Sequence, residues 1–322
     1  MSQKMPRSEA PHGKRGKTAA PVFTPEQRIY QSFSIEEDKA RTNVHYELPV
    51  EFFTTLTGGE WNTYSGNTWN RATTETESQE EKLDLLGELM GLHAGMRILD
   101  VGCGWGGPLV YLSRKFGVEG VGLTLSPLQK AAAEERVARH GVNVSIFERH
   151  WKDHTDDRPF DAVYTDEVIV HFNDLEGYFA KVYSLLRPGG LMLNKEVHYA
   201  HRRYAELTRA MAFVNEIYGF TGNYRTLADE LTLVGEAGFD LKSVDSLSTA
   251  QYARTVDQWS TNLKNGRTRL EALVGRETFR RFQVYLALGH RSLKAGHVTL
   301  DVVVAQKPKD GAGPVLVAGP TG

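Results

Sequence analysis

Short apolar runs alternate with longer amphipathic stretches through the middle of the chain. Strands that are covered on both faces read as continuous β-branched and aliphatic runs, whereas surface helices repeat apolar residues every three or four positions. Turn signals rich in glycine and proline separate the two kinds of segment. Strands that alternate with helices predict a doubly wound, mainly parallel sheet of the α/β class. The predicted parallel strands are 97–101, 118–123, 142–147, 160–165 and 191–196.

Two segments near the C-terminus, 240–247 and 297–306, alternate polar and apolar residues. Such alternation is typical of strands with one solvated face, so we expect these two to form an antiparallel edge and to bring the sheet to seven strands. Between the fifth strand and this edge, apolar residues at helical spacing predict a helical insertion over about 200–235 that roofs the active site.

The N-terminal segment 23–92 is rich in aromatic residues and has helical patterning, so we expect it to form a helical lid. Ser78 and Glu81 have the spacing of a capping box, which predicts a helix start at that point. The tails 1–22 and 309–322 lack a sustained apolar pattern, and both are predicted to be disordered.

The composition narrows the class of protein. The net charge is only −2 and charges of both signs are interspersed, which argues against a nucleic-acid partner. No apolar run is long enough for an integral membrane segment and 1–18 has no apolar signal core, so we expect a cytoplasmic protein. Cys103 is the single cysteine and the eleven histidines show no ligand spacing, so no metal is expected. A homo-oligomer is compatible with the sequence.

The first predicted strand ends in closely spaced glycines, in the run Asp100-Val-Gly-Cys-Gly-Trp-Gly-Gly107. Glycines let a ligand approach the backbone, and the helix that follows directs its N-terminus toward that ligand. A dinucleotide site also needs an acidic residue at the end of the second strand, and the run 123–126 has none. Asp100 offers a carboxylate to a cationic or amino group, and S-adenosylmethionine (SAM) carries both.

The motif Gly122-Leu-Thr-Leu-Ser126 followed by Gln129 resembles the cyclopropane-fatty-acid and mycolic-acid synthase family of SAM-dependent enzymes. The similarity covers about 43–308 and extends to Thr63-Tyr64-Ser65 and to Gln251–Trp259. It implies a Rossmann-like class I SAM-dependent methyltransferase fold, a SAM-binding catalytic domain at 93–308, S-adenosylhomocysteine as product, and a small-molecule or lipid-like substrate. The residues that it implies for SAM binding are Tyr64, Ser65, Asp100, Gly102, Gly104, Thr124, Leu125, Gln129 and Trp151.

In that family a bicarbonate ion acts as the base, held by a Cys, by a Glu-His pair and by a C-terminal Tyr. This chain has Gly66 at the Cys position and Val170 at the Glu position, whereas His171 and Tyr252 are present. Two of the four expected holders are therefore missing, which argues against bicarbonate binding and against cyclopropane formation.

Asp166 and Glu167 follow the fourth strand, where ligands of such sheets bind. We expect one of them to replace bicarbonate. Glu167 lies where the related geranyl diphosphate C-methyltransferases carry a Glu that looks like their general base. The resulting hypothesis is C-methylation of an unsaturated or prenyl-like carbon, with Glu167 as base, His171 positioning it, and Tyr252 as a further catalytic residue.

Three alternatives remain open from the sequence. In N-methylation of a small amine, a carboxylate at the strand end would pair with the ammonium group. In true cyclopropanation, the first adduct would be the same but a ring would close. A non-catalytic SAM-binding protein is the third. The candidate substrate-binding residues are Arg202, for an anionic head group, and the aromatic residues Tyr218, Trp259 and Phe282.

Overall fold

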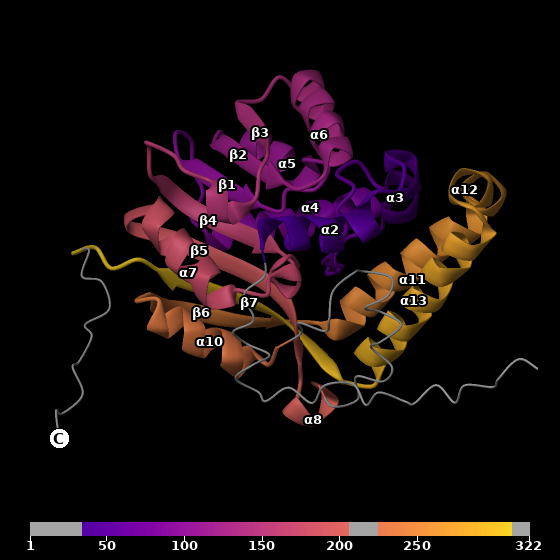
Figure 1. Ribbon diagram of the computed structural model, residues 1–322. Coiled ribbons are helices and arrows are strands. Elements are labelled where there is room, and N and C mark those ends of the chain that lie inside the picture. The colour runs from indigo at the N-terminus through magenta and orange to yellow at the C-terminus, as the bar shows by residue number, and fades with distance from the viewer. Residues whose placement is uncertain (1–33, 206–224, 311–322) are drawn as a thin grey trace, which may run out of the picture.

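The computed structural model describes residues 34–205 and 225–310, and in this part of the chain a seven-stranded sheet has the order β3-β2-β1-β4-β5-β7-β6 (Figure 1). Strands β1 to β5 pair in parallel, while β7 is antiparallel to both of its neighbours. The predicted mainly parallel sheet with an antiparallel end is confirmed. The strands are β1 Arg97–Val101, β2 Glu119–Thr124, β3 Val144–Glu148, β4 Phe160–Asp166, β5 Leu186–Tyr199, β6 Asp240–Leu247 and β7 Val298–Gln306.

Helices connect the strands and cover both faces of the sheet (Figure 1). Successive side chains of β1 point to opposite faces of the sheet. Ile98 packs into the apolar cluster with α4 and α5, and Leu99 packs into the cluster with α7 and α10. The helices are α2 Ile35–Tyr46, α3 Val50–Thr57, α4 Glu75–Leu89, α5 Gly107–Phe116, α6 Pro127–His140, α7 Leu175–Leu185, α8 Arg202–Ala205, α10 Leu227–Glu236, α11 Thr249–Asn265, α12 Arg267–Val274 and α13 Arg276–Lys294, with short turns η1 Trp151–Asp153 and η2 Ile169–His171.

The start of α4 differs from the sequence prediction by four residues. Thr74 caps the helix, and Thr74 and Glu77 form the reciprocal capping box that the sequence analysis assigned to Ser78 and Glu81. Ser78 instead lies inside the helix, where its hydroxyl donates to the carbonyl of Glu75. The spacing of a capping box occurs twice in this segment. The helix begins at the first of the two, because this adds a turn of helix.

A helical hairpin inserted between β6 and β7 forms a third apolar cluster (Figure 1). Helices α11 and α13 lie side by side and pack against α3 through Phe52, Phe53, Trp259 and Phe282. This stretch contains the motif Gln251–Trp259, but no helices were predicted for it from the sequence. The hairpin brings residues from the last quarter of the chain next to the N-terminal helices, and so beside the carboxyl ends of the strands.

None of the helices within 34–205 and 225–310 is long and apolar enough to cross a membrane.

Candidate active site

A pocket lies over the carboxyl ends of β1, β2 and β4, where doubly wound sheets bind their ligands. Helix α2 contributes Thr42 and Tyr46 to its wall, so the N-terminal helices close one side. All nine residues that the sequence analysis assigned to SAM line this pocket, namely Tyr64, Ser65, Asp100, Gly102, Gly104, Thr124, Leu125, Gln129 and Trp151.

The glycine loop after β1 needs its glycines for two reasons. Gly102 has a φ of 91°, and a Cβ on it would lie 2.6 Å from a methyl carbon of Val168. A Cβ on Gly107, the first residue of α5, would collide with the carbonyl oxygen of Trp61. Only glycine tolerates both the left-handed backbone and the close approach. The loop thus carries the chain from β1 to the N-terminus of α5 along the floor of the pocket.

Asp100 lies at the end of β1 with its carboxylate buried. Tyr164 donates a hydrogen bond from its hydroxyl to Oδ2 of Asp100 over 2.6 Å. Burial raises the pKa of Asp100 to about 7, and the Tyr164 hydrogen bond only partly opposes it. A buried carboxyl in this state gains from a cationic partner. Asp100 therefore suits the amino group of SAM.

Three further groups fit a nucleoside at the β2 side of the pocket. The hydroxyl of Thr124 donates to Oε1 of Gln129 over 2.6 Å, which fixes both side chains at the start of α6. The indole Nε1 of Trp151 is buried and finds no hydrogen-bond acceptor within the described residues. A buried donor of this kind is costly unless a ligand accepts from it. These residues fit the resemblance, which assigns Thr124 and Gln129 to the ribose.

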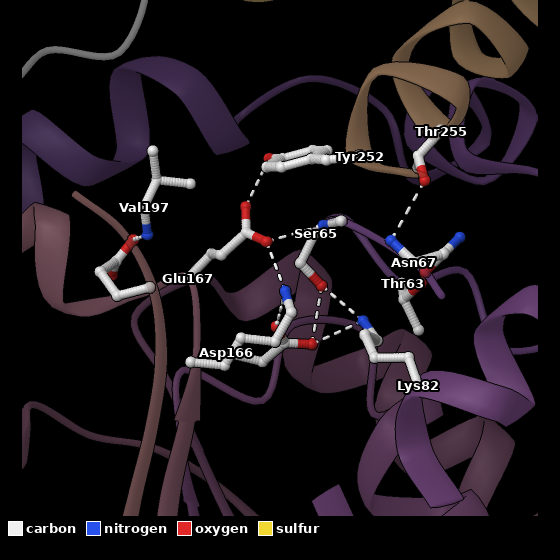
Figure 2. A network of polar contacts seen from close by, with 12 residues as sticks. Thr63, Ser65, Asn67, Lys82, Asp166, Glu167, Val197, Tyr252 and Thr255 are labelled. Atoms are coloured by element: carbon white, nitrogen blue, oxygen red, sulfur yellow. Dashed lines mark hydrogen bonds and ion pairs between the residues drawn. The ribbon is translucent and has the colours of Figure 1, made fainter. Parts of the chain in front are cut away.

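The opposite end of the pocket is lined by two carboxylates, Asp166 and Glu167 (Figure 2). Two fully buried lysines lie behind them. Lys82 donates to Oδ2 of Asp166 over 2.6 Å, and Lys195 donates to Oδ1 over 2.9 Å. The hydroxyl of Ser65 also donates to Oδ2 of Asp166, over 2.7 Å. Burial raises the pKa of Asp166, but the two ammonium groups outweigh it and hold the pKa well below its usual range. Asp166 is therefore a fixed anion at neutral pH.

Glu167 has three hydrogen-bond donors and a strained backbone. The backbone N–H of Gly66 donates to Oε1 over 2.7 Å, Lys195 donates to the same oxygen, and the hydroxyl of Tyr252 donates to Oε2 (Figure 2). Its φ is 60°, in the left-handed region that a residue with a long side chain rarely adopts. Strain of this kind persists at functional sites because the surroundings over-determine it. The donors orient one carboxylate toward the pocket, which Glu167 lines.

Lys82 and Lys195 were not among the residues predicted for the site, although the sequence carries a signal for both. Lys82 lies on the face of α4 that also buries Leu83 and Leu86, an unusual place for a cation. Lys195 pairs in register with Asp166 across β4 and β5, so the two side chains had to meet once the strands were known to be neighbours. Burial lowers the pKa of Lys195, but Asp166 and Glu167 outweigh it and raise that pKa.

His171 lines the pocket, and one of its contacts among the described residues is with Tyr46. Its Nε2 lies 3.4 Å from the hydroxyl of Tyr46. Burial lowers the pKa of His171 to about 4, which leaves the imidazole neutral at physiological pH. Lys195, Gly66 and Tyr252 hold Glu167.

The predicted substrate residues divide into three groups. Trp259 and Phe282 are buried behind the pocket, where Trp259 lies 5.2 Å from the ring of Tyr64 and Phe282 stacks on His45. Arg202 is exposed, pairs with Asp229 and is not among the residues that line the pocket. Tyr218 lies outside the described residues. The aromatic residues that do line the pocket are Tyr46, Tyr64, Trp105, Trp151, Tyr164 and Phe172.

Helix α2 is fastened across the pocket by one carboxylate. Oδ1 of Asp38 accepts a hydrogen bond from the side-chain amide of Asn173 over 3.1 Å, and its Oδ2 lies 3.3 Å from Nε2 of His150. Both partners belong to loops beyond the sheet, on either side of the pocket mouth. Asp38 thus ties the wall formed by α2 to the loops after β3 and β4. No three His, Cys, Asp or Glu side chains gather as a metal site within 34–205 and 225–310.

The family model of mycolic acid cyclopropane synthetase matches residues 33–303. A probable fatty acid methyltransferase of Pseudomonas putida is 31% identical over 237 residues, which are 72% of this chain but only 60% of that protein. The methoxy mycolic acid synthase MmaA3 of Mycobacterium tuberculosis is 30% identical over 282 residues, 81% of this chain and 94% of that protein.

Among solved structures, the mycolic acid cyclopropane synthase CmaA1, in complex with S-adenosylhomocysteine (SAH) and CTAB, has a TM-score of 0.79 at 27% identity. The alignment covers 84% of this chain and 98% of that chain. The fold agrees with this likeness. The chain belongs to the mycolic acid cyclopropane synthetase family, and it is a SAM-dependent methyltransferase.

Proposed function

We propose that the protein methylates an unsaturated carbon of a lipid-like acceptor, and that Glu167 removes the proton which the product must lose. The observation that carries this proposal is the orientation of the Glu167 carboxylate by Gly66, Lys195 and Tyr252 at the wall of the pocket. SAM supplies an activated methyl group and leaves as SAH.

The acceptor chemistry explains why a base is needed. The electron pair of a carbon–carbon double bond forms the new bond to the methyl carbon, which leaves a positive charge on the neighbouring carbon. The charge disappears when a carboxylate takes a proton from an adjacent carbon and the C–H electron pair becomes the new double bond. Glu167 is suited to this step because it lines the pocket and its carboxylate is held in one place.

The pocket wall suits a transient cation on carbon. The faces of aromatic rings attract positive charge, and the wall carries Tyr46, Tyr64, Trp105 and Phe172. These rings also contact one another, with Tyr46 and Tyr64 both 6.5 Å or less from Trp105 between centroids. An apolar chain would also pack against such a wall.

The charges around Glu167 disfavour the amine alternative. A carboxylate that binds an ammonium group must have no stronger cationic partner. Here Asp166 pairs with Lys82 and Lys195, and Glu167 pairs with Lys195. Two lysines thus balance two carboxylates inside the protein. A cationic acceptor would meet a locally neutral cluster, so we prefer an uncharged carbon acceptor.

Ring closure is the second candidate, and the relatives favour it. If the proton comes from the newly added methyl group, the C–H electron pair closes a cyclopropane instead of forming a double bond. The relatives are named as fatty acid methyltransferase, methoxy mycolic acid synthase and mycolic acid cyclopropane synthase. Their names support a lipid-like acceptor for this chain, and the cyclopropane synthase supports the ring as product.

The product identifies the reaction. The protein is incubated with methyl-labelled SAM and pools of unsaturated lipids, prenyl diphosphates and amines, and labelled products are analysed by NMR. We expect label on carbon, with olefinic signals for a methylated alkene or high-field signals for a cyclopropane. Label on nitrogen would reject the proposal in favour of amine methylation.

The role of Glu167 is tested with Glu167→Gln. We expect turnover to fall by about 100-fold or more, the scale of a lost general base, with SAM affinity unchanged. The fold should persist because Lys195 keeps Asp166 as its partner. Glu148→Gln, on the surface and outside the pocket lining, is the matched control and should keep full turnover. Near-normal turnover of Glu167→Gln would remove Glu167 as the base.

A further inference from the structure

The outer face of α13 carries a stripe of basic residues. Eight of its positions are exposed, and six of them repeat at intervals of three or four residues, which places these six along one side of the helix. Four of the six are cations and the two in the middle are small apolar residues. The other two exposed residues, Glu277 and Arg281, lie beside this set and pair with each other. We call this set the basic stripe, and it consists of Arg276, Arg280, Val284, Ala287, Arg291 and Lys294.

The stripe lies within a strongly basic part of the chain. The segment 249–297, which contains α11, α12 and α13, has nine Lys and Arg but only three Asp and Glu. The remaining residues carry 29 Lys and Arg and 37 Asp and Glu, so the hairpin has an excess of six positive charges while the remaining residues together have an excess of eight negative charges. A charge asymmetry of this size between parts of one chain is an argument about partners rather than about fold.

Within 34–205 and 225–310, the cations of the stripe form no ion pair. Other cations of the hairpin have carboxylate partners, such as Arg267 with Glu271. Among the described residues, no carboxylate lies within ion-pair distance of the four stripe cations. Intramolecular electrostatics therefore do not explain why they share one face. They repel one another mildly in solution, and an external anionic surface would relieve that repulsion.

The inner face of α13 connects the stripe to the active site. Phe279, Phe282 and Leu286 pack into the apolar cluster of the hairpin and α3. Phe282 stacks on His45 of α2, 5.3 Å between centroids, and α2 also carries Tyr46 of the pocket wall. The stripe is thus separated from the N-terminal helices of the pocket by little more than the thickness of one helix, about 10 Å.

We propose that the basic stripe of α13 docks the protein on a lipid surface that carries acidic phospholipids. The stripe runs for 18 residues, about 27 Å at 1.5 Å per residue, which suits a flat anionic surface better than a small ligand. Its centre is apolar, with Val284 exposed to 41%, while cations flank it on both sides. The apolar face of α13 is packed inside the protein and does not insert into lipid, so the stripe would bind an anionic surface mainly through its charges. Each basic residue near such a surface contributes about a fivefold gain in partitioning.

Vesicle binding tests the proposal without any turnover, so its outcome is independent of the proposed function. The full chain is sedimented with vesicles of phosphatidylcholine alone and with vesicles that also contain phosphatidylglycerol. We expect binding to the anionic vesicles only, weakening as salt is added. The variant Arg280→Gln/Arg291→Gln should lose about 25-fold in partitioning, the product of two single-charge effects. Arg114→Gln/Arg139→Gln removes the same charge from the exposed surface of α5 and α6 and should bind like the wild type.

SAM affinity and the thermal unfolding temperature are measured for both double variants to show that they are folded. Wild-type binding by Arg280→Gln/Arg291→Gln, or an equal loss in the control variant, would overturn the proposal. So would the absence of vesicle binding by a chain that is retained on a soluble polyanion such as heparin, because the stripe would then fit a soluble acidic partner. Loss confined to the stripe variant, with SAM affinity intact, supports it.

Discussion

A Cβ atom on Gly66 would lie 2.8 Å from Cγ of the Tyr252 ring. The missing side chain lets the ring lie against the loop while its hydroxyl reaches Glu167. We expect Gly66→Ala to displace Tyr252 and to lower turnover by about 100-fold, the scale of a misplacement of about 1 Å at a catalytic group. Steady-state kinetics and calorimetric SAM titration check this, with SAM affinity unchanged. Gly235→Ala is the control, because a Cβ there meets nothing within 4 Å.

Removing the Glu167 side chain leaves three donors, from Gly66, Lys195 and Tyr252, around an empty space of carboxylate size. We therefore expect Glu167→Ala to regain part of its lost turnover when formate, acetate or bicarbonate is added. The wild type should need none of these ions, since its own carboxylate satisfies the donors. Turnover is measured in bicarbonate-free buffer with increasing concentrations of each anion. A wild type that stops in that buffer would contradict the view that Glu167 replaces bicarbonate.

Lys195 is fully buried between two carboxylates. Lys195→Met leaves an uncompensated buried charge, which costs about 3–5 kcal/mol of unfolding free energy. The double variant Lys195→Met/Glu167→Gln should recover part of that loss, because one of the two carboxylates is then neutral. Urea unfolding of the three proteins measures the difference. Lys130→Met breaks an exposed pair with Glu134 and should cost less than about 1 kcal/mol. No recovery in the double variant would show that Lys195 acts by packing alone.

The raised pKa of Asp100 predicts how SAM binding depends on pH. Its pKa is about 7 without ligand, and a cation bound to its carboxylate requires the proton to leave. SAM affinity should therefore be weaker by about tenfold at pH 6 than at pH 7.5, with a proton released on binding. Calorimetry in two buffers of different ionisation enthalpy measures that proton. Asp100→Asn should bind weakly at both pH values, and an unchanged pH dependence in this variant would assign the proton to another group.

A second buried cluster makes stability depend on alkaline pH. His198 lies between Glu230 and Asp301, 2.7 Å and 3.0 Å away. Burial lowers the pKa of His198, but Asp301 and Glu230 outweigh it and raise the pKa to about 10. Because the pKa of His198 in the folded state lies above its unfolded-state value of about 6.5, its protonation stabilises the fold fully below pH 6.5. This contribution is lost as pH rises toward 10. Burial also raises the pKa of the neighbouring Glu196 to about 8. Ionisation of this buried carboxyl therefore lowers the stability of the fold as pH rises toward 8.

We expect the unfolding free energy to fall between pH 7 and pH 10. His198→Gln should be destabilised by about 3–5 kcal/mol at pH 7, because it leaves two carboxylates without their cation. The difference in unfolding free energy between variant and wild type should become smaller as pH rises. Urea titrations at both pH values measure it. A gap that stays constant with pH would mean that His198 is neutral in the folded protein.

The strand ends and the glycine loop were predictable from the sequence because their signals are local. The run from Asp100 to Gly107 contains a strand end, a turn and a helix start within eight residues, and the structure has all three there. The end of β4 was predictable for the same reason, so Asp166 and Glu167 were placed beside the pocket. The lipid-like acceptor was inferred from the resemblance and not from any local pattern.

The partners of these carboxylates were not predictable because they come from distant parts of the chain. Lys82 lies 84 residues before Asp166 and Tyr252 lies 85 residues after Glu167. Which of many lysines enters a buried pair depends on strand order and helix docking, which no single window of sequence contains. The role of His171 in positioning Glu167 stays a prediction, since sequence proximity to Glu167 does not by itself establish contact.

The hairpin of α11 and α13 is an insertion between β6 and β7, whereas the glycine loop belongs to the first strand and helix of the sheet. The pocket lining comes from residues 42–172, and the hairpin reaches it from behind, through Tyr252, which donates to Glu167, and Trp259, which lies against Tyr64. We therefore expect substitutions in the hairpin to alter the Glu167 end of the pocket while the glycine loop stays intact.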